Sequence, residues 1–80
     1  MKIRIKYYAS LRELVGTPSE ELNLEDGSKI EDLMRKIMEI HKPLKEVKRI
    51  LIAVNEDYVE MNENLRDGDL VALFPPVSGG

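Results

Sequence analysis

The sequence of 80 residues contains no cysteine. The chain therefore has no disulfide, no thiolate metal site and no thiol of its own that could act as a nucleophile or carry a persulfide. Aromatic residues are also few, since there are only three tyrosines, one phenylalanine and no tryptophan. If this protein handles sulfur, a group other than a side-chain thiol must hold it.

No charge of one sign dominates, because the sequence has 12 Lys and Arg residues and 15 Asp and Glu residues, which give a formal net charge of −3. The basic residues are scattered among acidic ones, which argues against nucleic acid as a partner. No apolar run approaches the roughly 20 residues of a membrane span, and the opening MKIRIKYY alternates where a signal peptide needs an uninterrupted apolar stretch. We expect a cytoplasmic protein with no membrane partner.

A chain of this length makes one domain, residues 1–80, with a small core. Hydrophobic residues are 42% and charged residues 34% of the chain, which is typical of a globular domain and not of a disordered one. So small a domain leaves no room for a buried catalytic cleft beside its core.

The first segment, residues 2–8, alternates strictly and predicts a half-buried strand with Tyr7 on the inner face and Tyr8 on the outer face. Residues 9–15 change to helical spacing, and Gly16 stands where a left-handed cap ends a helix. The sequence predicts a short helix after the first strand.

Residues 20–24 predict a second strand, and the longest helix follows it. Ser28 and Glu31 have the spacing of a capping box, and Pro43 forbids continuation. The apolar stripe of this helix consists of Ile30, Leu33, Met34, Ile37 and Met38. We expect His41 to be exposed near the end of the helix, with no functional role.

Residues 50–54 predict a largely buried strand, which a turn at residues 55–57 connects to a strand at residues 58–61. A last strand at residues 69–74 ends at two prolines, which cannot donate to a sheet ladder. This order favours an α+β domain with one main helix across a mixed sheet of four to five strands, and the first strand can lie parallel to the last. The pattern resembles the β-grasp fold.

No set of acid, base and nucleophile residues converges. The acidic pairs lie in predicted turns or at a helix start, where carboxylates bind free amides and interact favourably with the helix dipole. Ser10 and Ser78 lack a nearby base, and the glycines form no phosphate-binding loop. The sequence therefore predicts a protein that is not itself an enzyme.

The last strand is apolar on both faces. By alternation Val71 and Leu73 point to one side, whereas the other side receives Leu70, Ala72 and Phe74. A single helix covers only one of these faces.

Tyr8 and Tyr58 would join Phe74 on the uncovered face as an apolar, aromatic patch, which usually marks a partner site. The alternative is a core on both sides of the sheet that absorbs these residues.

The end of the sequence changes character after residue 74, where the folded body, residues 1–74, gives way to a tail, residues 75–80. Pro75 and Pro76 favour an extended course away from the sheet, and a slender arm follows that consists of Val77, Ser78, Gly79 and Gly80. Six extended residues reach roughly 20 Å, far enough to place a terminal carboxylate in another protein's active site. Adenylation by ATP would activate that carboxylate, so that a sulfur nucleophile could convert it to a thiocarboxylate, or a thiol and then an amine could convert it to an isopeptide. Because the chain has no cysteine, any sulfur would come from a partner and be held on Gly80.

Three stretches together, IKYYASLRELVG, AVN and the terminal DGDLVALFPPVSGG, resemble the small, sulfur-carrying subunit of molybdopterin synthase (MoaD-like). This group lies within the ubiquitin-like β-grasp sulfur carriers, which include the thiamine carrier ThiS. The resemblance covers essentially the whole chain.

The resemblance implies that an E1-like, ATP-dependent adenylyltransferase (MoeB-like) activates Gly80 and that a sulfur donor such as a cysteine desulfurase converts it to a thiocarboxylate. The tail would then enter the large subunit of the synthase (MoaE-like), where two sulfurs are added to cyclic pyranopterin monophosphate. The family implies no metal and no tightly bound cofactor on the carrier, since ATP is used by the activating enzyme.

By position, the resemblance implies that Tyr8, Tyr58 and Phe74 dock on both partners, although the two tyrosines depart from the expected Phe or Leu. Other hypotheses stay open. The chain could be a ubiquitin-like modifier joined through Gly80 to lysines, a sulfur carrier for thiamine or for transfer RNA thiolation, or an interaction module whose tail is an ordinary flexible end.

Overall fold

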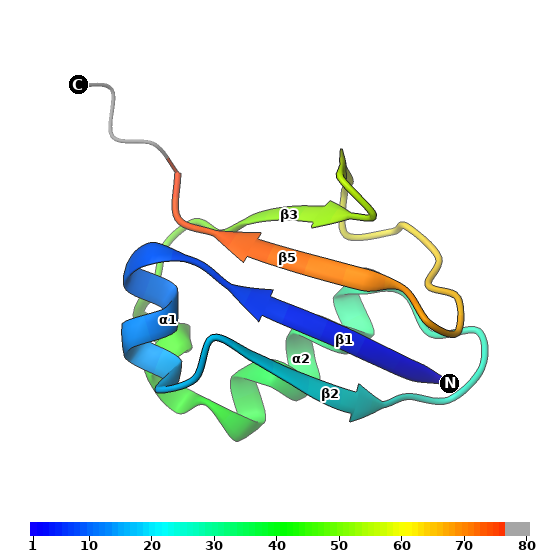
Figure 1. Ribbon diagram of the computed structural model, residues 1–80, viewed down its shortest axis with the longest axis horizontal. Coiled ribbons are helices and arrows are strands. Elements are labelled where there is room, and N and C mark those ends of the chain that lie inside the picture. The colour runs from blue at the N-terminus through cyan, green and yellow to red at the C-terminus, as the bar shows by residue number, and fades with distance from the viewer. Residues whose placement is uncertain (77–80) are drawn as a thin grey trace.

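The computed structural model describes residues 1–76 and contains a five-stranded sheet with two α-helices and one 3-10 helix (Figure 1). Along the chain the elements are β1 (Lys2–Tyr7), α1 (Ala9–Val15), β2 (Ser19–Asn23), α2 (Ile30–Ile40), η1 (Lys42–Glu46), β3 (Leu51–Val54), β4 (Asp57–Tyr58) and β5 (Leu70–Phe74). The predicted α+β class with one main helix is confirmed.

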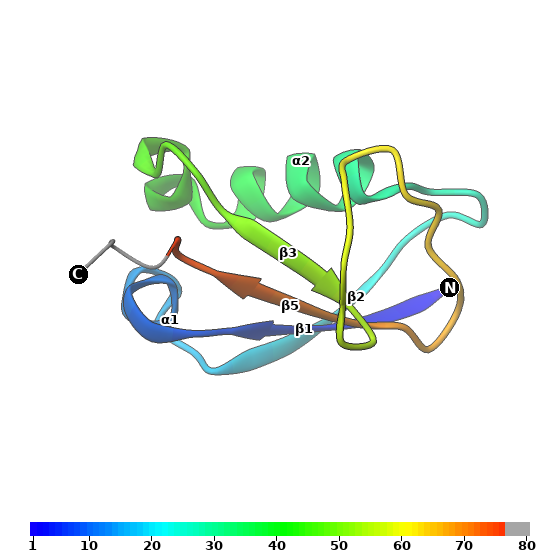
Figure 2. The ribbon, with the colours of Figure 1, turned by 90° about the horizontal axis from the view of Figure 1, so that it is seen from above.

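The strand order in the sheet is β2-β1-β5-β3-β4, so the last strand lies in the centre. β1 and β5 are parallel, whereas β1 with β2, β5 with β3 and β3 with β4 are antiparallel. Helix α2 lies across one face of this sheet and leaves the opposite face open, as Figure 2 shows. The expected mixed sheet, with its first strand parallel to its last, is confirmed.

The core lies between α2 and the sheet, and each element contributes the residues that its periodicity predicts. β1 alternates exposed and buried side chains, and the apolar stripe of α2 turns its face toward the sheet. The most enclosed side chains, none more than 3% exposed, include Ile3, Ile5, Tyr7, Leu11, Ile30, Leu33, Met34, Ile37, Leu44, Val71 and Leu73. Gly16 ends α1 at a φ of 88°, which confirms the predicted left-handed cap.

The start of α2 differs from the predicted capping box by one residue. Lys29 is the N-cap, and its backbone N–H donates to Oδ2 of Asp32 over 2.8 Å. This hydrogen bond holds the pKa of the Asp32 carboxyl below its usual value. The Ser28 hydroxyl donates instead to the carbonyl of Glu25 over 2.7 Å, closing the preceding turn. The predicted pairing of Ser28 with Glu31 is therefore wrong.

The loop after β4 binds the first free N–H groups of α2. The N–H of Ile30 donates to the carbonyl of Glu63 over 3.0 Å, and that of Glu31 donates to the carbonyl of Met61 over 2.9 Å. The Met61 carbonyl, which lies in the predicted strand, is therefore not available to a β ladder. This is the physical reason why the predicted strand at residues 58–61 is wrong beyond its first residue, since β4 ends at Tyr58.

His41 is not the exposed residue that we expected, because its side chain is only 17% exposed. Its Nε2 lies 2.5 Å from Oε2 of Glu20 on β2, and the Tyr7 hydroxyl donates to the same oxygen. The Tyr7 and His41 rings meet edge-on with centroids 5.8 Å apart. The chain turns at the end of α2 and brings His41 against the sheet, so that one carboxylate joins β1, β2 and the helix end.

Burial and the neighbouring Glu20 raise the pKa of the Tyr7 hydroxyl far above its ordinary value of 10.0. A folded-state pKa above the unfolded one stabilises the fold fully below about pH 10, and this contribution falls as the pH rises further. We therefore expect the free energy of unfolding, measured by urea titration, to fall more steeply between about pH 9 and pH 11 in the wild type than in Tyr7→Phe.

Tyr58→Phe is the matched control for Tyr7→Phe, since Tyr58 is 72% exposed. This variant should keep the wild-type dependence on pH. Equal slopes for Tyr7→Phe and the wild type would show that the Tyr7 hydroxyl contributes nothing to alkaline sensitivity.

Candidate functional site

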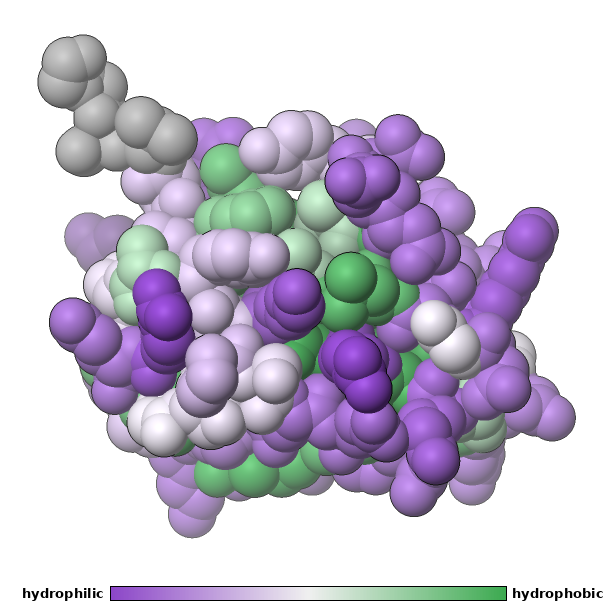
Figure 3. All heavy atoms as spheres, viewed as in Figure 1, coloured by the Kyte–Doolittle hydropathy of each residue, from purple (hydrophilic) through white to green (hydrophobic). Residues whose placement is uncertain are grey.

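The face of the sheet opposite α2 is the candidate site, and β5 supplies its centre. Val71 and Leu73 are fully buried beneath α2, whereas Leu70, Ala72 and Phe74 are only partly covered and point to the open face. The predicted division of this strand is confirmed. Figure 3 shows the open face, where hydrophobic side chains gather over the sheet and hydrophilic side chains surround them.

Three aromatic side chains from three parts of the chain meet on this face. The Phe74 ring stacks on Tyr8, which directly follows β1, with centroids 5.0 Å apart and planes at 23°. Tyr58, on β4, approaches Phe74 from the other side at 6.1 Å and 53°. Tyr8 is 39% exposed and Tyr58 is 72% exposed. The structure thus brings together the three residues that the sequence proposed for partner binding, and their docking role stays a prediction.

A shallow hollow of about 390 Å³ lies among these rings. Its floor is low because Ala53 and Ala72 are opposite one another on β3 and β5, so two small side chains adjoin. The complete lining consists of Lys6, Tyr8, Ala53, Glu56, Tyr58, Leu70, Ala72 and Phe74. Alternation along residues 2–8 puts Lys6 on the same side as Tyr8, but sequence reasoning assigned Lys6 no role at the site. Sequence reasoning missed Ala53 and Glu56, because a local pattern does not show which strand or turn lies beside β5.

The polar rim of the hollow includes one cation that is free to meet a partner. Lys2 and Arg4, earlier on β1, lie 3.9 Å and 3.0 Å from carboxylate oxygens of Glu21. Lys6 lies opposite Ser19 on β2, and no carboxylate of residues 1–76 is within ion-pair distance of it. An apolar centre with a polar rim is the usual composition of a protein interface.

The open face combines flat aromatic rings with a polar rim. Within the part of the chain that the structure describes, no group of three or more His, Asp and Glu side chains is placed to hold a metal ion. Across the same residues, the helices are too short or too polar to cross a membrane. Flat rings around a shallow, open hollow favour contact with the surface of another protein.

The tail begins at the edge of this site. β5 ends at Phe74, and Pro75 and Pro76 follow it outside any strand. The remaining residues that we proposed for the tail and its reactive end, Val77, Ser78, Gly79 and Gly80, lie outside the described residues. Their roles stay predictions.

The neighbours Leu73 and Phe74 allow a direct test of which face is structural. Leu73→Ala should lower the free energy of unfolding by about 2–5 kcal/mol, because it leaves a cavity under α2. Phe74→Ala removes a partly exposed ring and should cost about 1 kcal/mol or less, which in a domain of this size lowers the melting temperature by no more than about 4–8 °C. Urea titration of each variant measures its free energy of unfolding. A loss for Phe74→Ala as large as that for Leu73→Ala would place Phe74 in the core and remove it from the docking patch.

The model of the ThiS family matches residues 5–80. A molybdopterin synthase sulfur carrier subunit from Chlamydomonas reinhardtii is 41% identical to the chain over 83 aligned residues, with all of both chains covered.

Solved structures agree with this comparison. A Pyrococcus furiosus protein with the provisional name molybdopterin converting factor subunit 1 is 38% identical, with a TM-score of 0.91 over 96% of this chain and 99% of that one. The small archaeal modifier protein 1 of Methanosarcina acetivorans is 30% identical, with a TM-score of 0.83 over 99% and 96%. A complex of subunits 1 and 2 of the molybdopterin-converting factor from Helicobacter pylori contains the same fold, at 23% identity, full coverage of both chains and a TM-score of 0.72.

Proposed function

This chain belongs to the ThiS family, and we propose that it is a sulfur carrier of molybdopterin synthesis that bears its sulfur on the carboxylate of Gly80. The observation that carries the proposal is the position of the aromatic patch, which consists of Tyr8, Tyr58 and Phe74. Phe74 is the last residue of β5, so the patch lies directly beside the start of the tail. A partner that binds this patch would receive the tail beside its own binding surface.

The central position of β5 supports this use of the tail. β5 pairs with β1 as far as Leu73 and with β3 as far as Phe74, so the sheet holds the strand to its end. From there, six residues suffice to span roughly 20 Å. Docking on the rigid sheet would bring the carboxylate of Gly80 to a fixed region of the partner, and two glycines would fit a narrow channel.

The carboxylate needs a leaving group before it can accept sulfur. An E1-like adenylyltransferase (MoeB-like) would join the Gly80 carboxylate to AMP from ATP and release pyrophosphate. The terminal sulfur of a persulfide on a donor such as a cysteine desulfurase would then attack the acyl carbon and displace AMP, which leaves an acyl disulfide between Gly80 and the donor. A thiol would reduce this disulfide, so that Gly80 keeps the sulfur as a thiocarboxylate and the two thiol sulfurs end as a disulfide. Because the chain has no cysteine, all sulfur chemistry before this step belongs to partner proteins.

The acceptor complex would form with the large subunit of the synthase (MoaE-like). The Helicobacter pylori complex of subunits 1 and 2 supports this assembly. In our proposal Tyr8, Tyr58 and Phe74 form the apolar centre of the interface, and the pterin is bound and sulfurated by the large subunit. The activating enzyme would use the same face, so the two partners bind in turn.

Intact mass tests the carrier chemistry directly. The purified protein, whose initial mass verifies that Gly80 is its last residue, is incubated with the activating enzyme, ATP and a sulfur donor. Exchange of one oxygen for sulfur should add about 16 Da, and a variant that lacks Gly80 should not gain this mass. An unchanged mass, while the same enzymes sulfurate another carrier in a parallel reaction, would contradict the proposal.

A second candidate function is covalent attachment of Gly80 to lysines of other proteins, which the likeness to the small archaeal modifier protein 1 favours. The same activation would serve both functions. Lysine peptides that bear the tail remnant in a digested cell lysate would support the modifier, and a thiocarboxylate without such peptides would support the carrier. Transfer of sulfur from the carrier to thiamine precursors or to transfer RNA would assign it to those pathways instead.

Phe74→Ala should also weaken binding to the large subunit, by about 10- to 30-fold, because Phe74 stands at the centre of the patch. Isothermal titration calorimetry measures the effect. Ile40→Ala is the matched control, since Ile40 is 48% exposed but lies on α2, on the other side of the sheet. Equal affinities of the two variants would exclude the patch from the interface.

A further inference from the structure

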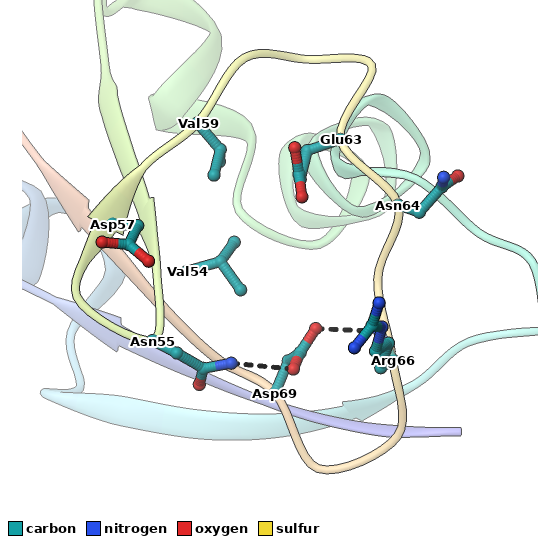
Figure 4. A pocket seen from close by; sticks show the side chains of 8 residues that line it. All are labelled: Val54, Asn55, Asp57, Val59, Glu63, Asn64, Arg66 and Asp69. Carbon is teal, nitrogen blue, oxygen red and sulfur yellow. Dashed lines mark hydrogen bonds between the residues drawn. The ribbon is translucent and has the colours of Figure 1, made fainter.

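A hydrogen-bonded pair of side chains joins the turn between β3 and β4 to the start of β5. Figure 4 shows Asn55 on this turn and Asp69 beside it, at the edge of a pocket. The Asn55 Nδ2 group donates to Oδ1 of Asp69 over 2.9 Å. The side-chain oxygen of Asn55, Oδ1, accepts from the N–H of Leu70 over 3.0 Å. The other Asp69 oxygen accepts from the N–H of Arg66 over 2.8 Å. We call Asn55 and Asp69 the turn clamp.

The clamp is built into the fold. Asp69 is 9% exposed and is the only charged side chain of residues 1–76 that is buried. Both of its oxygens are bonded, as a buried carboxylate requires. The backbone N–H of Asn55 also donates to the carbonyl of Leu70 over 2.9 Å, so backbone and side chain attach the turn to β5 together.

The turn itself is conformationally demanding. Asn55 has a φ of 49° and Glu56 a φ of 77°, so two successive residues other than glycine take the left-handed conformation. Asparagine tolerates this region well, whereas glutamate does not. Bonds from outside the turn must therefore stabilise it.

Tyr58 follows this turn on β4, and few contacts of its own strand hold it in place. β4 is two residues long and pairs with β3 only at residues 53–54, with one further hydrogen bond from the N–H of Val59 to the carbonyl of Ile52. The Tyr58 side chain is 72% exposed, yet its ring lies 6.1 Å from that of Phe74. The backbone of the turn, and not packing around Tyr58, sets this position.

We propose that Asn55 and Asp69 are positioning residues for docking, which hold the β3–β4 turn so that Tyr58 stands beside Phe74 before the partner arrives. Fixing the ring in advance lowers the entropy lost on binding. The inference rests on the proposed docking function and adds to it residues that lie outside the hollow.

Asn55→Gly is the first test, because glycine keeps the positive φ and removes both side-chain hydrogen bonds. In the free protein, nuclear Overhauser contacts between the Tyr58 and Phe74 rings should be lost, whereas those between Tyr8 and Phe74 should remain. Affinity for the large subunit should fall about five- to tenfold. Unchanged Tyr58–Phe74 contacts in Asn55→Gly would overturn the proposal.

A second comparison separates positioning from general stability. In a Tyr58→Ala background, Asn55→Gly should cause no further loss of affinity, because the clamp acts through the missing ring. The same loss in both backgrounds would show that the clamp only stabilises the fold and would overturn the proposal. If Asn55→Gly does not fold, Asn55→Asp can replace it in both backgrounds. This variant also breaks the hydrogen bond to Asp69, because it replaces the amide donor with a second carboxylate.

Exchange of the two side chains supplies a rescue. In the double variant Asn55→Asp with Asp69→Asn, the amide at position 69 donates to the carboxylate at position 55. The remaining oxygens can accept from the N–H groups of Arg66 and Leu70. Each single exchange should weaken the Tyr58–Phe74 contacts, and the double exchange should restore them. Failure of the double variant to restore them would contradict a clamp of this geometry.

The ring contacts are measured without any partner, so the two proposals fail separately. If Tyr58→Ala leaves affinity for the large subunit unchanged, docking through Tyr58 is wrong, whatever the ring contacts show. If Tyr58→Ala weakens binding but Asn55→Gly preserves both the ring contacts and the affinity, the docking function stands and the clamp is wrong.

Discussion

The parallel pairing of β1 with β5 is the interaction on which the rest of the structure depends. It joins two antiparallel pairs, β1 with β2 and β3 with β4, into one sheet, because β5 also pairs with β3. At its two ends the N–H of Arg4 donates to the carbonyl of Asp69 and the N–H of Tyr8 donates to the carbonyl of Leu73. Without this pairing there is no continuous surface for α2 to cover and none for a partner to meet.

Because side chains of a β-strand alternate between its two sides, β5 contributes both to the core and to the open face. Val71 and Leu73 complete the core under α2, and the residues between and after them form the open face. The two uses are independent because they occupy opposite sides of one backbone. A protein of 80 residues can in this way present an aromatic surface without weakening its small core.

Features that depend on neighbouring residues were predictable from the sequence, whereas those that depend on distant partners were not. Alternation and a glycine cap placed β1, α1 and β5 within about one residue, and alternation placed Tyr8 and Phe74 on the open face. The end of β4 and the burial of His41 were mispredicted because α2 and Glu20, which contact them, are distant in the sequence. The start of α2 is an exception, since two local contacts, Lys29 with Asp32 and Ser28 with Glu25, move it by one residue from the predicted cap. The alanine floor and the turn clamp require the register of β3 against β5, which no local pattern contains.

The central place of β5 has a consequence for protein synthesis. Translation produces β5 after the other four strands of this sheet, and until residues 70–74 have emerged those strands cannot join into one sheet. A translation product that is interrupted before β5 would lack the centre of the sheet and Phe74, and with Phe74 both ring contacts of the aromatic patch. Such truncated chains would therefore lack both the fold and the open face that the proposed docking requires.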